Sequence, residues 1–396
     1  MSESEEKPPP PTIEAHHLSA LRLFAIIALF LVASAYAIWK SDRFQSMIHG
    51  VSQTGLAQAL GRPVTFETVE IRLFPPTIRL ANVRIGNDPS LPGPLFSAEA
   101  VSIGGGIALV GNELRIGRVR ALRPKLSLTQ LPDGKWNLPP GLSRPSKQGG
   151  VKLHVASVLV QEGMLDLQGR QIGISGSLEQ FAAQLDSLPL DRYRGSLDAR
   201  RATLRLSGAE PLTTQLSMRF LLDTARGVTF EDVGLSGAFG RIRASGSIET
   251  AGKTNSIFQA SGDVSIDEVE RIFHSPLGFS GGARLDARVE IPPAGGFRIT
   301  GTATAPQVRA HQFTFDNLVA SVAARPEALT VRIERADYAA GRANGVLRIG
   351  NLTSKPQPIT LAIEAAGLSL ERFFGDIGLK GTGLSGSGTL SVALRW

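Results

Sequence analysis

The stretch LTTQLSMRFLL, residues 212–222, sets the fold class of this chain. Its apolar side chains recur at every second position, with Leu216, Met218 and Phe220 in one phase and Arg219 in the other. Because successive side chains of a β-strand point to opposite faces, this alternation predicts a strand with one apolar and one polar face.

The same period-two pattern recurs in later segments, including residues 258–266, 283–290, 329–333 and 359–363. The 396 residues include 43 glycines and 24 prolines, and 42% are hydrophobic, which indicates strands joined by tight turns rather than disorder. We predict a mainly β fold, an elongated and curved antiparallel sheet of the repeating β-groove type with an apolar inner face. The residues expected to line that face are Leu216, Met218, Phe220, Val264, Ile266, Leu285 and Val289.

The segment LFAIIALFLVASAYAIW, residues 23–39, contains no charged residue. As a helix it spans about 26 Å, close to the thickness of a bilayer's hydrocarbon core. Extended back to Leu18, it predicts one transmembrane anchor over residues 18–39. The anchor residues expected to contact lipid are Leu23, Phe24, Ile26, Ile27, Leu29, Phe30, Leu31, Val32, Ile38 and Trp39.

Two other interpretations of this segment remain open. A cleaved signal peptide is one, because Ala33-Ser34-Ala35 fits a small-x-small cleavage site, although the apolar run exceeds the usual signal core and the preceding tail is acidic. A buried soluble helix is the other, although such a helix is rarely apolar on every face. The length of the run favours the uncleaved anchor.

The chain changes period after the apolar segment. Residues 42–60 predict a short amphipathic helix, since Phe44, Met47, Ile48 and Val51 follow helical spacing. Residues 64–138 then alternate as one-face-apolar antiparallel strands separated by Pro- and Gly-rich turns. We interpret Gly104-Gly105-Gly106 as one of these turns, because it lacks the third glycine and the helix of a dinucleotide-binding fingerprint.

The residues that follow the apolar segment resemble a known family. The matching segments are GRPVTFETVEIRLFPPTIRLANVRIGNDPS at 61–90, PLFSAEAVSI at 94–103 and NELRIGRVRALRPKLSLTQLPDGKWNL at 112–138. Together with the preceding span and short helix, this succession resembles the N-terminal region of the AsmA-like proteins, relatives of the TamB translocation-and-assembly proteins. The resemblance covers about residues 20–140 and rests on pattern more than on invariant chemistry.

The resemblance implies a single-pass anchor in the inner membrane of a two-membrane bacterium, with most of the chain in the periplasm. It also implies a long apolar β groove that carries phospholipid toward the outer membrane, or that aids outer-membrane protein assembly. The expected organisation is a disordered cytoplasmic tail at 1–17, the anchor at 18–39, an AsmA-like helix and β domain at 40–138, a linker or long loop at 139–150, and repeated β-groove modules at 151–396.

An internal sequence repeat supports the prediction of repeated modules. Residues 261–291 and 365–396 each contain a strand, a short helical segment, a Gly/Ser turn and an alternating strand. The spacing of about one hundred residues predicts a repeated unit of several strands. The chain stops at Trp396, directly after the second copy, so we expect either an incomplete last module or a strand edge open to further pairing.

The sequence offers no candidate for catalysis, a cofactor or a metal. It has no cysteine, its six histidines lack metal-ligand spacing, and neither a nucleophile elbow nor a Walker A sequence occurs. We therefore expect that the protein is not an enzyme. Its net charge of +7 comes from scattered arginines without an aromatic RNA-binding motif, which favours a solvated face attracted to anionic lipid over nucleic-acid binding.

Three functions fit this pattern. Acyl chains of phospholipid could fill an open apolar groove and contact the seven predicted lining residues. Exposed strand edges could instead pair with outer-membrane or periplasmic protein partners. A closed sandwich with a structural role is the third possibility. Small residues such as Ala260, Gly262 and Ala287 at inward positions favour the groove, since a packed core of this length needs bulkier side chains.

Overall fold

The computed structural model divides the chain into two units, Met1–Ala59 and Leu60–Trp396. It describes Gln53, Thr54, Ala57 and residues 60–395, except for short gaps at 73, 111–112, 134, 140–151, 170–173, 207–209, 224, 250–254, 273–276, 293–295, 353–356, 380–382 and 384. The predicted tail, the anchor at 18–39 and nearly all of the helix at 42–60 lie outside the described residues, as does most of the predicted linker.

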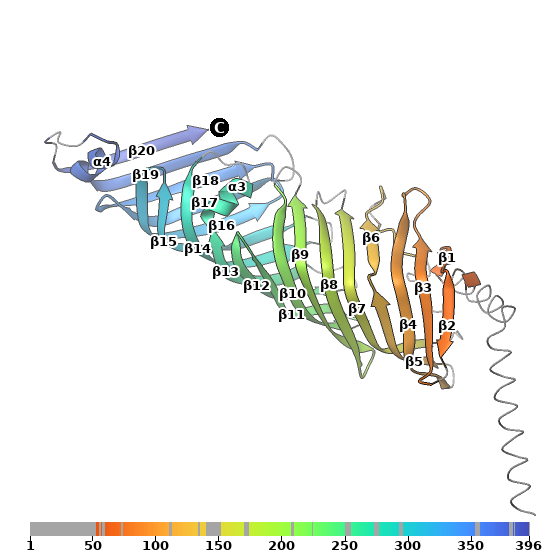
Figure 1. Cartoon of the computed structure of the whole chain (residues 1–396). Coiled ribbons are helices and arrows are strands. Elements are labelled where there is room, and N and C mark those ends of the chain that lie inside the picture. The colour runs from red at the N-terminus through yellow and green to blue at the C-terminus, as the bar shows by residue number, and fades with distance from the viewer. Residues whose placement is uncertain are drawn as a thin grey trace, which may run out of the picture. The chain divides into compact units, whose positions relative to one another are not determined.

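The alternating segments form one curved sheet of 20 strands, so the prediction of a mainly β fold is confirmed (Figure 1). Two short helices interrupt the strand order. The strands are β1 (Val64–Thr65), β2 (Thr68–Arg72), β3 (Thr77–Gly86), β4 (Pro94–Val110), β5 (Glu113–Leu122), β6 (Lys125–Thr129), β7 (Lys152–Gly169), β8 (Ile174–Leu188), β9 (Arg192–Leu206), β10 (Leu212–Asp223), β11 (Gly227–Gly237), β12 (Gly240–Glu249), β13 (Ser256–Ser265), β14 (Phe279–Ile291), β15 (Arg298–Ala310), β16 (Phe313–Arg325), β17 (Ala328–Tyr338), β18 (Gly341–Gly350), β19 (Ile359–Ser369) and β20 (Ser387–Arg395). The helices are α3 (Ile266–Ile272) and α4 (Leu370–Asp376).

The sheet is mixed rather than purely antiparallel, which corrects one part of the prediction. β7 runs parallel to both β5 and β6, whereas every other strand pair is antiparallel. The chain between Thr129 and Lys152 is long enough for the crossover that parallel neighbours require. Period two is the same in both arrangements, so the alternation itself did not distinguish them.

The three consecutive glycines at 104–106 do not form a turn, which is a second correction. They lie inside β4, where the register with β5 shifts between Gly104 and Ile107. Gly105 and Gly106 have φ values of 76° and 101°, a region that favours glycine. On the neighbouring strand β5, a Cβ on Gly117 would lie 2.1 Å from the Gly105 carbonyl oxygen. The glycines therefore permit a bulge in β4 and a close approach of the β4 and β5 backbones.

Asn137 ties the N-terminal end of the sheet together. Its side chain is fully buried, its Oδ1 accepts from the Thr129 amide at 2.9 Å, and its Nδ2 donates to the Ser127 carbonyl and to Asn87 Oδ1. These contacts join β6 to the turn after β3. The segment DGKWNL at 133–138, which contributed to the family resemblance, therefore has a structural role in closing this end.

The predicted internal repeat corresponds to two strand–helix–strand units, β13–α3–β14 and β19–α4–β20. In the first, the Ser265 amide donates to the Phe239 carbonyl at 2.8 Å, and in the second the Ser369 amide donates to the Ala339 carbonyl at 2.7 Å. Each serine also accepts from a backbone amide three residues on, as a helix N-cap does. The two units lie six strands apart in the sheet.

The sheet curls onto itself toward its C-terminal end. Leu277, just before β14, belongs to one buried cluster with Ile349 of β18 and Ile359 of β19. A second cluster combines Tyr338 and Leu368 with half-buried aromatic side chains of β16 and α4. Residues of one face thus pack against each other between β14 and β20, and this packing forms the main core of the region.

Candidate functional site

One continuous row of residues crosses the sheet from β2 to β20 without a polar side chain. We call it the central row. Each member is the registered partner of the next, and partners in a strand pair lie on the same face. The central row consists of Val69, Leu80, Val101, Ala121, Val160, Ala183, Leu197, Met218, Val233, Ala244, Ala260, Ala287, Gly301, Val322, Val331, Leu347, Leu361 and Leu394.

Two further rows flank the central row on the same face and also contain only apolar residues and glycine. The first, on the side of the helices α3 and α4, consists of Phe181, Ala199, Leu216, Leu235, Ile242, Gly262, Leu285, Ala303, Ala320, Ile333, Gly345, Ile363 and Val392. The second, on the other side, includes Val158, Leu185, Gly195, Phe220, Phe230, Gly246, Phe258, Val289, Ile299, Ala324, Leu329, Ile349 and Ile359.

Aromatic rings in the flanking rows cover glycines on neighbouring strands. A Cβ on Gly195 would lie 2.2 Å from the Phe220 ring, and a Cβ on Gly163 would lie 2.5 Å from the Phe181 ring. The rings of Phe220 and Phe230 are 6.2 Å apart between centroids. The rings therefore need the space that the missing side chains leave, and glycine is a packing partner at these positions rather than only a turn residue.

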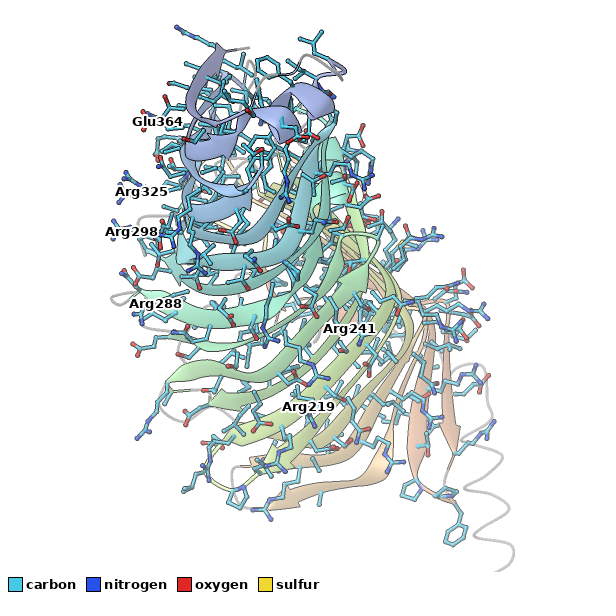
Figure 2. All side chains as sticks on the ribbon, turned by 90° about the vertical axis from the view of Figure 1, so that its left-hand side faces the viewer. Arg219, Arg241, Arg288, Arg298, Arg325 and Glu364 are labelled. Carbon is cyan, nitrogen blue, oxygen red and sulfur yellow. The ribbon has the colours of Figure 1, made fainter. Side chains whose placement is uncertain are left out.

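The opposite face of the sheet is polar and charged. Figure 2 shows its labelled charged side chains spread over several strands. Two of its ion pairs are Arg219–Asp232, with Nη2 and Oδ2 3.1 Å apart, and Arg288–Glu290, with Nε and Oε1 2.9 Å apart. The arginines of both pairs are exposed, so these contacts contribute little to stability and mainly keep this face solvated.

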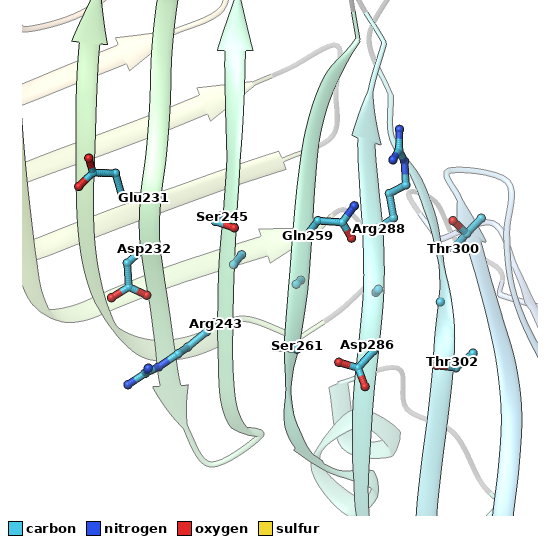
Figure 3. A pocket seen from close by; sticks show the side chains of 14 residues that line it. Glu231, Asp232, Arg243, Ser245, Gln259, Ser261, Asp286, Arg288, Thr300 and Thr302 are labelled. Atoms are coloured by element: carbon cyan, nitrogen blue, oxygen red, sulfur yellow. The ribbon is translucent and has the colours of Figure 1, made fainter.

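A hollow of about 580 Å³ on the polar face is one candidate for a polar ligand (Figure 3). Its lining includes Asp232 of β11, Arg243 of β12, and Asp286 and Arg288 of β14. Arg243, Asp286 and Arg288 are exposed to solvent. Asp232 and Arg288 are already ion-paired with Arg219 and Glu290. Exposed charges of both signs do not form a catalytic or anion-binding arrangement, so we interpret the hollow as solvated surface.

Exposure along the apolar rows changes from the middle of the sheet to its C-terminal end. In β10–β13, row members such as Met218, Val233 and Ala260 are half-buried. Further along, Ala320 is only 1% exposed and Leu361 only 6%. Burial at the C-terminal end is confined to part of the face, because Val322 and Leu347 of the central row are half-buried as well and Leu394 is 44% exposed.

The predicted lining residues fall on this face, with one exception. Leu216 and Leu285 lie in the first flanking row, Phe220 and Val289 in the second, and Met218 in the central row. Val264 pairs with Gly240 and Ala283 beyond the first flanking row. Ile266 does not continue β13 as the alternation suggested, because it is the first residue of α3, whose start is capped by Ser265.

Sequence reasoning missed most of the central row. Leu80, Val101 and Ala121 belong to it, although the prediction placed the groove after residue 151 only. Val160 and Ala183 lie within the predicted range but were not named. The period-two alternation within strands β3–β8 already marked these residues as members of an apolar face. Extending the face to them required the register across the parallel β5–β7 pair, which no local pattern contains.

The strongest electrostatic perturbation lies at the C-terminal end of the face. Tyr338 is 3% exposed, and its hydroxyl donates to Asp376 Oδ2 of α4 at 3.1 Å. Burial first, and the contact with Asp376 second, raise the pKa of the Tyr338 phenol above its usual range. The phenol therefore stays protonated and acts as a hydrogen-bond donor that holds α4 against β17.

The described part of the chain holds no group of three or more acidic or histidine side chains placed to bind a metal ion. Within those same residues, neither helix has the length and apolar character needed to cross a bilayer. Comparisons of the chain with family models, with curated proteins and with solved structures found no match. The three apolar rows and their register define the candidate site.

Proposed function

We propose that the apolar rows form the inner face of a β groove that binds the acyl chains of phospholipid. The observation that carries this proposal is the central row, which continues through 18 strands without a polar residue. At about 4.8 Å between strands, 18 strands extend about 80 Å along the curved sheet. An apolar track of that length suits movement or storage of chain-like ligands better than recognition of one compact molecule.

Half-buried side chains in the middle strands give lipid binding its driving force. Leu216, Met218 and Phe220 retain partly exposed apolar surface that an acyl chain would cover. Each methylene transferred from water to such a surface contributes about 0.8 kcal/mol. The charged opposite face keeps the sheet soluble, and lipid headgroups remain in water at the edges of the strands.

We further propose that the protein acts in the envelope of a two-membrane bacterium, held by residues 18–39 in the inner membrane. The apolar composition of residues 23–39 and the resemblance of residues 20–140 to AsmA-like proteins support this placement. The groove then carries phospholipid between membranes without catalysis. The strands need no enzymatic group for this role, since burial of apolar surface alone binds the cargo.

Native mass spectrometry of the full-length chain, purified with and without added phosphatidylethanolamine, tests the proposal. We expect phospholipid to bind the wild-type chain and the Met218→Asp variant to bind it about tenfold more weakly, because a charge then faces the acyl chain. Ser217→Asp is the matched control, since the same charge on the adjacent, exposed position faces away. Circular dichroism checks that both variants keep their β content.

Two results would contradict the proposal. If the wild-type chain binds no phospholipid, then phospholipid is not the ligand of the groove. If the Met218→Asp and Ser217→Asp variants lose bound lipid equally, then the lipid does not bind specifically on the apolar face. In the first case the covered C-terminal core would favour a purely structural role.

Strand addition is a second candidate function, favoured by the outer edge of β20. Among the described residues β20 is paired only with β19, so its other edge offers free backbone groups to an extended segment. Peptides with alternating outer-membrane strand sequences, added to the chain, test this function. Protection of the β20 amides from hydrogen exchange would support strand addition, and unchanged exchange would contradict it.

A further inference from the structure

The C-terminal end of the apolar face contains a partly enclosed cavity of about 240 Å³. Four phenylalanine side chains contribute to its wall, namely Phe279, Phe313, Phe315 and Phe373. Apolar cavities of about 150 Å³ remain dry and accept benzene, so this volume has room for a longer alkyl segment.

The cavity wall offers a ligand almost no hydrogen-bonding partners. Among the described residues, its lining side chains with polar groups are Tyr338 and His311. The Tyr338 hydroxyl already donates to Asp376, and its ring packs 5.0 Å from the Phe315 ring between centroids. A lipid headgroup would leave its charge and hydrogen-bonding groups without partners there, whereas a hydrocarbon chain would not.

The cavity is continuous with the apolar rows. Leu361 and Leu394 line it and are the last two members of the central row, while Ile363 and Val392 line it and end the first flanking row. Leu394 is 44% exposed, so the row passes from solvent at this residue into the enclosed space. An acyl chain that follows the rows therefore reaches the cavity without crossing a polar side chain.

Helix α4 covers the cavity and is fixed to the sheet at both ends. At its start, the Leu370 amide donates to the Gly386 carbonyl at 3.1 Å, and the Leu370 side chain occupies the space above Gly388. At its end, Asp376 accepts from Tyr338. Phe373, between these two attachments, is the side chain of α4 that lines the cavity.

We propose that this cavity holds the terminal methyl end of one acyl chain of a lipid bound along the apolar rows, with α4 as its cap. The proposal rests on the proposed function and deepens it. It assigns an end point to the groove, where one chain is anchored by its tail while the headgroup stays outside. Chain length then becomes a property that the protein can discriminate, because a volume of about 240 Å³ limits how much of the tail enters.

Photo-crosslinking of the full-length chain with a phosphatidylethanolamine that carries a diazirine at the end of one acyl chain tests this proposal. We expect the crosslinks to map to the cavity wall. Ala365, 4% exposed on β19, lines the cavity, so Ala365→Phe fills it and should lower these crosslinks about tenfold while total bound lipid stays within twofold. Ala366→Phe, one residue on and exposed, is the matched control.

Val392→Phe fills the same cavity from β20, so a folding defect in the β19 variant does not decide the result. Crosslinks in the cavity that both filling variants abolish, and that Ala366→Phe retains, support the proposal. Bound lipid whose chain ends crosslink only to β7–β13, unchanged by the filling variants, overturns it and leaves the proposed function standing. A chain that binds no lipid overturns both, and total bound lipid identifies that case.

Discussion

The middle strands β7–β13 and the C-terminal strands β14–β20 carry the same apolar rows but use them differently. Met218 and Val233 of the central row are half-buried in the middle strands, and Val322 and Leu347 are half-buried in the C-terminal strands. Leu361 of the same row, by contrast, is 6% exposed and belongs to a buried cluster. The difference comes from the curl that brings Leu277 against Ile359. A period-two pattern therefore fixes the face but not whether that face is filled by the protein itself.

This contrast teaches where stability and binding reside. Apolar residues that pack against the chain's own side chains stabilise the fold, while those left half-covered retain surface for a ligand. Substitutions at matched positions of one row should then separate the two roles, and the following predictions run from the largest expected effect to the smallest.

The largest effect compares two members of the central row. Leu361→Ala should lower the free energy of unfolding by about 2–5 kcal/mol, because it opens space in the C-terminal cluster. Met218→Ala should lower it by only about 1 kcal/mol, since Met218 is half-buried without lipid. Urea unfolding of the full-length variants measures both. Equal losses would break the distinction between the two regions.

The next effect concerns glycine in the middle strands. A Cβ on Gly246 would lie 2.2 Å from the Ile257 carbonyl oxygen, so Gly246→Ala should cost about 1–3 kcal/mol through overpacking. Gly282→Ala is the control, because no heavy atom lies within 4 Å of the added Cβ. Thermal unfolding of the two variants compares them, and a neutral Gly246→Ala would show that the middle strands are packed more loosely than described.

A smaller effect tests the cap of the covered region. Tyr338→Phe removes the hydrogen bond to Asp376 and should cost about 1 kcal/mol. Because that contact holds one end of α4, the amides of residues 370–376 should exchange with deuterium faster, while those of β10–β13 keep their rates. Exchange that is unchanged in α4 would mean that Leu370 alone holds the helix in place.

The smallest effect extends the comparison to the N-terminal end. Hydrogen bonds from the Ser90 hydroxyl and amide and from Arg62 hold the pKa of Asp88 below its ordinary value of 3.8. A lowered pKa means that this stabilisation is present above pH 3.8 and is lost as the pH falls through the folded-state value. Urea unfolding from pH 6 to pH 2.5 should show wild type losing its advantage over Asp88→Asn only in acid.

Much of the fold follows from local pattern, and the rest depends on contacts between distant strands. Alternation around Met218 and Leu285 predicted the β fold and the face to which both belong. A short helix after β13 was predicted, but Ile266 was placed in the strand rather than in α3. The parallel β5–β7 pair and the bulge at Gly105 were not predicted, because each depends on register between distant strands. A helix cap at Ser265 was the one local signal that could have ended β13 before Ile266.

The candidate site was predicted in kind but not in extent. Residues such as Leu216 and Phe220 were identified from their own strands, while the pairing of Phe220 with Gly195 needs the register of β9 against β10. Closure of the face at Leu361 depends on how far the sheet coils over several strands. Strand coiling accumulates from small twists at each pair, so no single segment encodes it.

The measurement that tests the central claim most directly uses the absence of cysteine from the chain. A single fluorophore is attached at Met218→Cys or, in a second protein, at the adjacent Ser217→Cys, and each full-length protein is loaded with phospholipid brominated along its acyl chains. We predict that the bromines quench the fluorophore at position 218 and leave the one at 217 bright. Equal quenching at both positions, or a bright fluorophore at 218 with lipid bound, would contradict acyl-chain binding on the apolar rows.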